Sequence, residues 1–311
     1  MPTLASIGQA WRTQDYTMLQ LRRFRDAQGS VVTVREQVAV DACGGDVPNF
    51  ELAFLGVEGE LAGSAVTQKW QQTYSRFDKL FFLHSSFHVK DLGKAAVNYQ
   101  LHDFGPIVRA NRSARRFVVW PQQLDKSVWL VDVDMQTSVP LYCAEFDPHM
   151  RMLSEVEGLS FTPATPTVAV AASSIVALAD FSAATSYLGH PNGLVDPNVL
   201  LTSEYTLGQV EVRDDPLNGR QKLVMTYTDG IDEFMIVQTP NTPDAFASLQ
   251  ARSGKGAPSA SLGHTIARYR DPAMSVLIFW EDGVSFQVAG RGSLQRLDEL
   301  ARQLYLQARS N

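Results

Sequence analysis

Apolar and polar residues alternate with a period of two over much of the chain. The first such segment puts four β-branched residues on one face, namely Val32, Val34, Val38 and Val40. The same alternation recurs in further segments, at 50–54, 129–133, 142–146, 223–227, 234–238 and 284–288. Strands with this pattern have one face on a core and the other in water. We therefore expect a protein built on antiparallel β-sheet.

Three segments have a helical period instead. In one of them, Trp70, Tyr74, Phe77 and Phe81 are spaced four, three and four residues apart, so four aromatic rings share one helical stripe. Such a stripe either packs on the sheet or lines a ligand cavity beneath the helix. A closing helix is expected at 294–304, with Ser293 as its N-cap. A shorter N-terminal helix is expected at 4–15.

A change of composition divides the chain. Residues 163–197 contain four prolines and almost no charge. We expect an N-terminal domain at 1–162, a connector at 163–197 and a C-terminal domain at 198–311. In the C-terminal domain, the sequence TDG at 228–230 is typical of a hairpin turn. The polar segment 240–261 is expected to form a long exposed loop.

Composition and charge exclude some functions. The 311 residues include 27 Lys and Arg against 33 Asp and Glu, which gives a net charge of −6. Nucleic acid is not an expected partner, because phosphate-binding surfaces depend on clustered basic side chains. The most basic stretch, from Arg109 to Arg116, is interpreted as the solvated entrance of an apolar strand. The longest apolar stretch, 168–178, is too short to span a bilayer, and the first residues do not have the pattern of a signal peptide.

Candidate catalytic chemistry is sparse. His84 and His88 are four residues apart and so can share a metal ion, but the acidic residue of the HExxH motif is missing between them. Asp132 and Asp134 precede a turn, where Asp is favoured because its side chain bonds local N–H groups. Motifs for a nucleophile elbow, a phosphate loop or a dinucleotide are missing. We therefore expect no enzyme, no metal and no cofactor, with a metal-dependent hydrolase that uses His84 and His88 as the alternative.

The two cysteines leave the redox state open. Cys43 and Cys143 lie in different predicted strand regions, and a bridge between them would close a loop of about 100 residues. The alternative is a pair of ordinary buried thiols, since free cysteine is common in protein cores.

Segments in both halves of the chain carry a family resemblance. Between Tyr99 and Phe161, the arginines Arg109, Arg112 and Arg115 precede the sequence DKSVWLVDVDMQTSVPLYCAEFDPHMRMLSEVEGLSF. In the second half, VMTYTDGIDEFMIVQ is followed by FWEDGVSFQVAGRGSLQRLDELARQL. These motifs resemble the RseB/MucB family of periplasmic sigma-E regulatory proteins, whose N-terminal domain is similar to lipoprotein carriers of the LolA type.

The resemblance implies an α+β fold, with an N-terminal LolA-like half-open antiparallel β-barrel covered by helices and a smaller C-terminal antiparallel sheet with one closing helix. It also implies a non-enzymatic periplasmic protein that binds an acyl chain, a lipoprotein or an envelope polypeptide, with a membrane-anchored anti-sigma factor as partner. A protein-interaction module without a lipid ligand is the alternative. In such a fold we expect a hydrophobic ligand groove, lined by Val32, Val34, Leu52, Phe54, Trp70, Tyr74 and Phe77.

Overall fold

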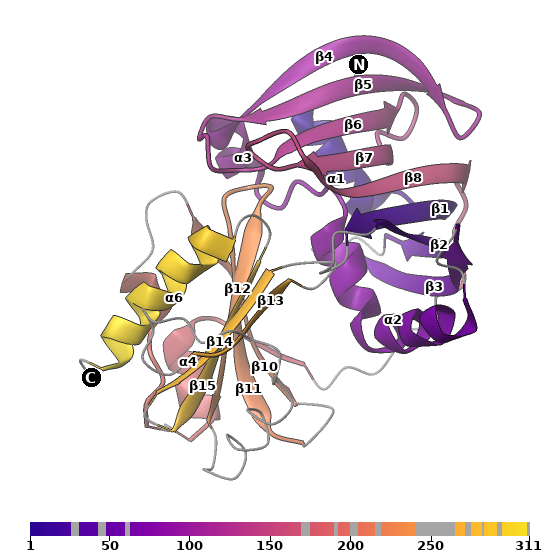
Figure 1. Cartoon of the computed structure of the whole chain (residues 1–311). Coiled ribbons are helices and arrows are strands. Elements are labelled where there is room, and N and C mark those ends of the chain that lie inside the picture. Colours follow the sequence, from indigo (N-terminus) through magenta and orange to yellow (C-terminus); the bar gives the residue numbers. More distant parts are fainter. Residues whose placement is uncertain are drawn as a thin grey trace. The chain divides into compact units, whose positions relative to one another are not determined.

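The computed structural model of the chain contains two compact units, Met1–Ala171 and Ala172–Asn311 (Figure 1). Each unit is built on one antiparallel sheet. The residues that the structure describes are 1–25, 31–42, 48–59, 63–168, 175–189, 192–199, 205–214, 219–240, 265–270, 275–281, 283–290 and 294–309.

The sheet of the first unit has eight strands in the order β3-β2-β1-β8-β7-β6-β5-β4. The strands are β1 Tyr16–Arg25, β2 Val31–Asp41, β3 Asn49–Glu58, β4 Tyr99–Arg109, β5 Arg112–Pro121, β6 Val128–Asp134, β7 Pro140–Phe146 and β8 Met152–Thr162. Figure 1 shows that this sheet is strongly bent, and it stays open because β3 and β4 are its two ends. The predicted half-open antiparallel barrel is therefore confirmed.

Helices cover one face of this sheet. They are α1 Leu4–Thr13, α2 Ser64–Ser85 and the short α3 Leu92–Asn98, so the helices expected at 4–15 and around Trp70 are confirmed. The segment after α2 also lies on this face, where the ring centroids of Phe87 and Trp129 are 5.4 Å apart. The valines of β2 and β6 that point to this face are buried. Each buried side chain of this size contributes about 1.5–3 kcal/mol, so this layer stabilises the unit.

Strand β1 was not predicted, because two polar residues interrupt its apolar pattern. Gln20 and Arg22 point to the helix-covered face and are buried there. Met18, which precedes them on the same face, pairs with Val38 of β2. A buried arginine in a strand breaks the alternation on which prediction from sequence depends.

The border strand β4 is interrupted near its middle. Its register with β5 shifts between Asp103 and Gly105, which is a β-bulge. Gly105 has φ +95, a backbone conformation that suits glycine, and its N–H donates to Oδ1 of Asp103 at 2.8 Å. Pro106 follows directly and has no N–H to donate. The bulge and the proline together leave this border without a regular row of hydrogen-bonding groups.

The sheet of the second unit has seven strands in the order β13-β14-β15-β12-β11-β10-β9. The strands are β9 Val176–Leu178, β10 Thr206–Asp214, β11 Gln221–Thr228, β12 Glu233–Pro240, β13 Thr265–Arg270, β14 Ser275–Glu281 and β15 Val284–Gly290. The closing helix α6, Leu294–Ala308, packs on β14 and β15 through Leu297, Ala301 and Leu304. The predicted smaller antiparallel sheet with one closing helix is confirmed.

The structure bears on three further expectations. Part of the predicted connector 163–197 forms β9 and the helix α4, Phe181–Tyr187, and β9 pairs with β10, because its apolar residues pack on the second unit. The basic stretch from Arg109 to Arg116 contains the hairpin turn between β4 and β5, where two residues have φ 48 and 58. From Arg112 onward it is the predicted entrance of an apolar strand, with its arginines partly exposed. Cys143 is buried in β7, and Cys43 lies outside the described residues, so the bridge between them stays a prediction.

Two further expectations fall on residues that the structure does not describe. These are the N-cap Ser293 and almost all of the loop expected at 240–261. Among the helices of the described ranges, none is both long and apolar enough to cross a bilayer.

Candidate functional site

The predicted groove residues belong to α2 and to the neighbouring strands β2 and β3. The described ones are all buried or half-buried: Val32, Val34, Leu52, Phe54, Trp70 and Tyr74. The ring centroids of Phe54 and Tyr74 are 5.3 Å apart, which shows direct packing of helix on strand. The side chain of Phe77 lies outside the described part of the chain. The structure thus brings these residues together, but their own rings fill the space between helix and sheet.

A buried ion pair ties the C-terminal end of α2 to the sheet. Arg22 of β1 donates from Nε to Oε1 of Glu36 on β2 at 3.0 Å, and neither side chain has any exposed surface. Arg22 also donates to the backbone oxygen of Ser85 at 3.0 Å and to Oγ of Ser86 at 3.2 Å. Tyr74 donates its hydroxyl to the other oxygen of Glu36. Burial raises the pKa of Tyr74, and the charge of Glu36 raises it further.

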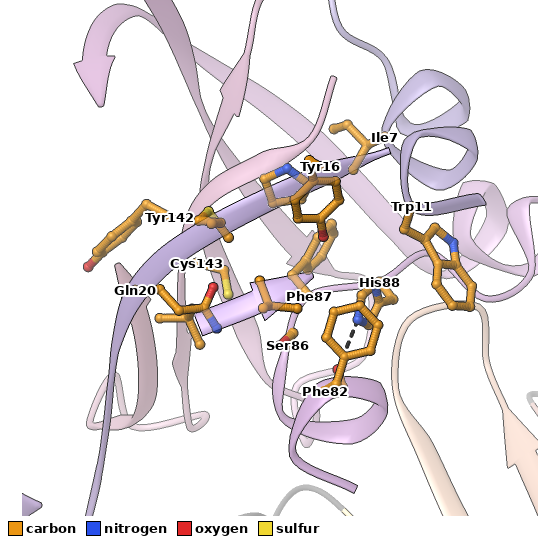
Figure 2. Close-up of a pocket in the computed structure, with 14 residues that line it drawn as sticks. Ile7, Trp11, Tyr16, Gln20, Phe82, Ser86, Phe87, His88, Tyr142 and Cys143 are labelled. Carbon is orange, nitrogen blue, oxygen red and sulfur yellow. Dashed lines mark hydrogen bonds between the residues drawn. The ribbon is translucent and has the colours of Figure 1, made fainter. Parts of the chain in front are cut away.

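A small cavity lies beside this cluster, beneath α1 and the segment after α2 (Figure 2). Its volume is about 30 Å³, and its lining includes Trp11, Tyr16, Phe82 and His88. A cavity of this size holds a water molecule or two and is far too small for an acyl chain. This cavity therefore does not offer space of ligand size.

His88 lies in the wall of this cavity and packs against its neighbours there. Its Nε2 lies 3.0 Å from the backbone oxygen of Phe82, and its ring centroid is 4.8 Å from that of Trp11. The side chain of His84, the other member of the predicted metal-binding pair, lies outside the described residues. Within the described ranges, no group of three His, Cys, Asp or Glu residues is placed to hold a metal ion.

A larger hollow lies on the opposite face of the sheet, which we call the apolar trough. It has a volume of about 410 Å³, and the atoms that face it are apolar. Its lining residues come from β4 to β7 and from the turn after β7: His102, Phe104, Val118, Trp120, Val128, Leu130, Phe146 and Met150. The strand register places Val118 opposite Leu130, and Val128 opposite Phe146. The volume falls in the range of small-molecule sites.

The trough was missed in the sequence, although a signal for it exists. Val118 and Trp120 alternate with the core residues Phe117 and Val119, so the strand is apolar on both faces. The segment 128–131 of β6 is also apolar throughout. In an antiparallel sheet with one face in water, such an uninterrupted apolar run marks a second apolar face.

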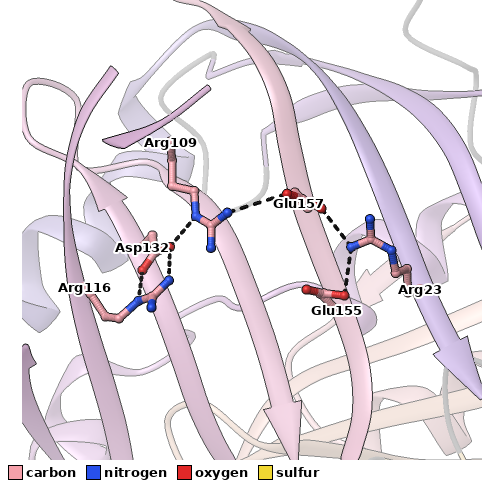
Figure 3. Close-up of polar contacts among 6 residues, drawn as sticks. All are labelled: Arg23, Arg109, Arg116, Asp132, Glu155 and Glu157. Atoms are coloured by element: carbon pink, nitrogen blue, oxygen red, sulfur yellow. Dashed lines mark hydrogen bonds and ion pairs between the residues drawn. The ribbon is translucent and has the colours of Figure 1, made fainter. Parts of the chain in front are cut away.

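A row of ion pairs lies on the same face of the sheet as the trough (Figure 3). Arg116 donates from Nε to Oδ1 of Asp132 at 2.7 Å, and Arg109 donates to Oδ2 of the same carboxylate at 2.6 Å. Arg109 also lies 3.5 Å from Glu157, and Arg23 bridges Glu157 and Glu155 at 2.8 and 2.9 Å. The guanidinium groups keep part of their surface in water, whereas Asp132 is fully buried beneath them.

The carboxylate of Asp134 stabilises the turn after β6, as predicted. It accepts the backbone N–H groups of Thr137 at 2.8 Å and Gln136 at 3.0 Å, and it accepts Nε of Arg112 at 2.6 Å. Partial burial works to raise the pKa of Asp134, but the hydrogen bonds from Arg112 and the turn outweigh burial and hold the pKa below its ordinary value.

This lowered pKa predicts a dependence of stability on pH. Because the folded pKa of Asp134 is below the unfolded value of about 3.9, the contribution of this carboxylate is complete above that value and is lost as pH falls through the folded pKa. Urea unfolding at neutral pH should therefore show Asp134→Asn to be less stable than wild type. The difference should shrink below about pH 4. For Arg112→Gln, the loss of stability relative to wild type should also become smaller below about pH 4. A loss that is the same at all pH values would contradict the role given to the carboxylate of Asp134.

Comparison with known proteins identifies the fold. No family model and no curated protein matches the chain. A crystal structure of MucB matches with a TM-score of 0.54 and 14% identity, over 98% of this chain and 95% of that chain. The chain has the MucB fold. Structures of MucB with MucA(peri) and of Pseudomonas aeruginosa MucA/MucB match with a TM-score of 0.51, at 15% and 14% identity, each over 96% of this chain and 95% of theirs.

The match to MucB runs across both units. The RseB/MucB-like fold predicted from turn and alternation motifs is thereby confirmed. At this level of identity, the similarity to MucB establishes the architecture, and function has to be argued from it separately.

Proposed function

We propose that the chain is a non-enzymatic binding protein of the periplasm that holds the periplasmic segment of a membrane-anchored anti-sigma factor. One observation carries the proposal: the match to MucB covers nearly the whole of both chains, and a matched MucB structure contains MucA(peri). A protein of this type acts by occupying its partner and needs no catalytic group. Release of the partner would then link the state of the envelope to transcription.

The side-chain geometry is consistent with a binding role. The buried charges of the first unit are engaged in fixed contacts, as the pair of Arg22 and Glu36 illustrates. Charged groups in such pairs stabilise a scaffold or specify its geometry, whereas catalytic acids and bases need access to a substrate.

A direct binding experiment tests the proposal. We expect the purified full chain to form a complex with the periplasmic segment of the anti-sigma factor from the same cell, seen as a single earlier peak in size-exclusion chromatography. A scrambled segment of the same composition is the control. Free elution of both components at concentrations of about 10 μM, well above typical dissociation constants of specific complexes, would contradict the proposal.

A lipid ligand at the predicted groove residues remains a prediction with a clear structural requirement. Because Trp70, Tyr74 and Phe54 fill the space between α2 and the sheet, an acyl chain there requires α2 to move away from β3. The hydrogen bonds from Arg22 to Ser85 and Ser86 oppose this movement. Fatty-acid uptake at this groove would thus increase when Arg22 is replaced, which fluorescence titration measures.

A further inference from the structure

We propose that the apolar trough binds a single-chain amphiphile with an anionic headgroup, such as a fatty-acid carboxylate. The chain would lie in the trough between Phe104, Trp120 and Leu130, and the headgroup would lie at Arg116, where the row of ion pairs begins. This site is on the face opposite the helices, so it is separate from the predicted groove and does not depend on the proposed protein partner.

The lining of the trough favours a hydrocarbon chain over a polypeptide. A peptide main chain carries an N–H and a C=O on almost every residue, and each of them needs a partner when buried. The atoms that face the trough are apolar and offer no such partners. A saturated acyl chain has no hydrogen-bonding group to satisfy, and its burial is favourable in proportion to its area.

The volume and shape of the hollow also suit this occupant. A hollow of about 410 Å³ is more than ten times the volume of the cavity beneath α1, and it is open to solvent along the sheet. Phe104 and Met150 keep 67% and 53% of their surface exposed, so the walls lose water only when a ligand covers them. Exposed apolar surface of this kind marks a site of binding.

The charges beside the trough complement an anionic headgroup. Arg116 and Val118 are two positions apart on the same face of β5, which places them about 6.6–6.8 Å from each other. Asp132 and Leu130 have the same relation on β6. At this end two guanidinium groups, those of Arg116 and Arg109, share the single carboxylate of Asp132. The row as a whole pairs three arginines with three carboxylates, and at the end that adjoins the trough the partly exposed guanidinium group of Arg116 lies above the buried Asp132.

Arg116 has donors left for a ligand. Its Nε and Nη2 bond Asp132 at 2.7 and 2.8 Å, whereas its Nη1 has no partner among the residues that the structure describes. The side chain keeps 29% of its surface exposed, above an Asp132 with none. A guanidinium group presented in this way binds carboxylate or phosphate through charge-assisted hydrogen bonds.

A fluorescence titration of the full chain with dansyl-undecanoate tests the site. We expect saturable binding, and we expect dodecanoate to displace the probe at lower concentration than dodecanol does. Phe104→Ser should weaken binding by about tenfold, because the ring loses its contact with the chain. The matched control is Val108→Ser, which lies on the same strand with 70% exposure but outside the lining, and it should leave binding unchanged.

The headgroup is tested separately. Arg116→Gln should raise the dissociation constants of dansyl-undecanoate and of dodecanoate and leave the dissociation constant of dodecanol, obtained by competition, unchanged, while Arg35→Gln, which replaces an exposed paired arginine of β2, should change none of the three. If Arg116→Gln does not fold, the comparison of Phe104→Ser with Val108→Ser still decides the question. The proposal is overturned if uptake is absent, if Val108→Ser weakens binding as much as Phe104→Ser, or if only Leu52→Ser in the predicted groove weakens it. Complex formation with the anti-sigma segment is a different readout, so the two proposals can fail independently.

Discussion

Replacement of Arg22 by methionine should lower the free energy of unfolding of the first unit by about 3–5 kcal/mol. Methionine keeps much of the length of the side chain, but it leaves the carboxylate of Glu36 buried without its main partner. It also removes the donors to Ser85 and Ser86 at the end of α2. Urea unfolding monitored by tryptophan fluorescence measures the change, because Trp11 and Trp70 report on the helices that cover the sheet.

The control for this prediction is another strand arginine with a glutamate partner. Arg35 pairs with Glu58 at 3.4 Å, and both side chains are well exposed. Arg35→Met should therefore cost less than about 1 kcal/mol. The double variant Arg22→Met/Glu36→Leu should recover part of the lost stability, because removal of both charges leaves no unpaired one in the core. If the single and the double variant lose the same amount of stability, the unpaired charge of Glu36 is not the cause of the destabilisation.

Trp129→Ala should destabilise the first unit by a similar amount, about 3–5 kcal/mol. Trp129 has no exposed surface and packs edge-on against Phe87 on the helix-covered face of β6. Its truncation leaves a cavity that the neighbouring strands are too constrained to close, and the cost grows with the volume of the cavity. Thermal unfolding followed by circular dichroism should show a clear decrease in Tm.

A second tryptophan in the same sheet provides the control. Trp120 of β5 points to the opposite face and keeps 43% of its surface exposed. Trp120→Ala should change the unfolding free energy by less than about 1 kcal/mol. Because Trp120 lines the trough, its loss should instead weaken binding of dansyl-undecanoate. Similar stability losses for both tryptophans would contradict the assignment of the two faces.

The sequence predicts the parts of the fold in which one face of a strand is mainly apolar. The valines of β2 and the alternation of Trp129, Val131 and Val133 in β6 indicate strands correctly, because apolar side chains dominate the covered faces of these two strands. The same rule fails at β1, where Gln20 and Arg22 occupy core positions. These residues are stabilised there by Glu36, which is 14 residues from Arg22 along the chain. A partner at that separation cannot be read from a local pattern.

The candidate site is predictable only in part, for a related reason. Tyr74 of the aromatic stripe packs on Phe54 of β3, but whether side chains fill a groove or leave it open depends on packing in three dimensions. The apolar trough combines residues from four strands and a turn, from His102 to Met150. Its local signal is the pair of apolar runs in β5 and β6, which a core strand can also have.

The bulge and the proline in β4 affect the tendency of the protein to self-associate at high concentration. An open sheet offers its last strand as a template on which a strand from a second molecule can add, and repeated addition leads to fibres. At β4 an incoming strand would find its register broken at Gly105 and a missing donor at Pro106. Pro106→Thr combined with removal of the bulge should therefore promote self-association. The bulge and the proline thus favour solubility at β4, the border strand that also contributes apolar residues to the trough.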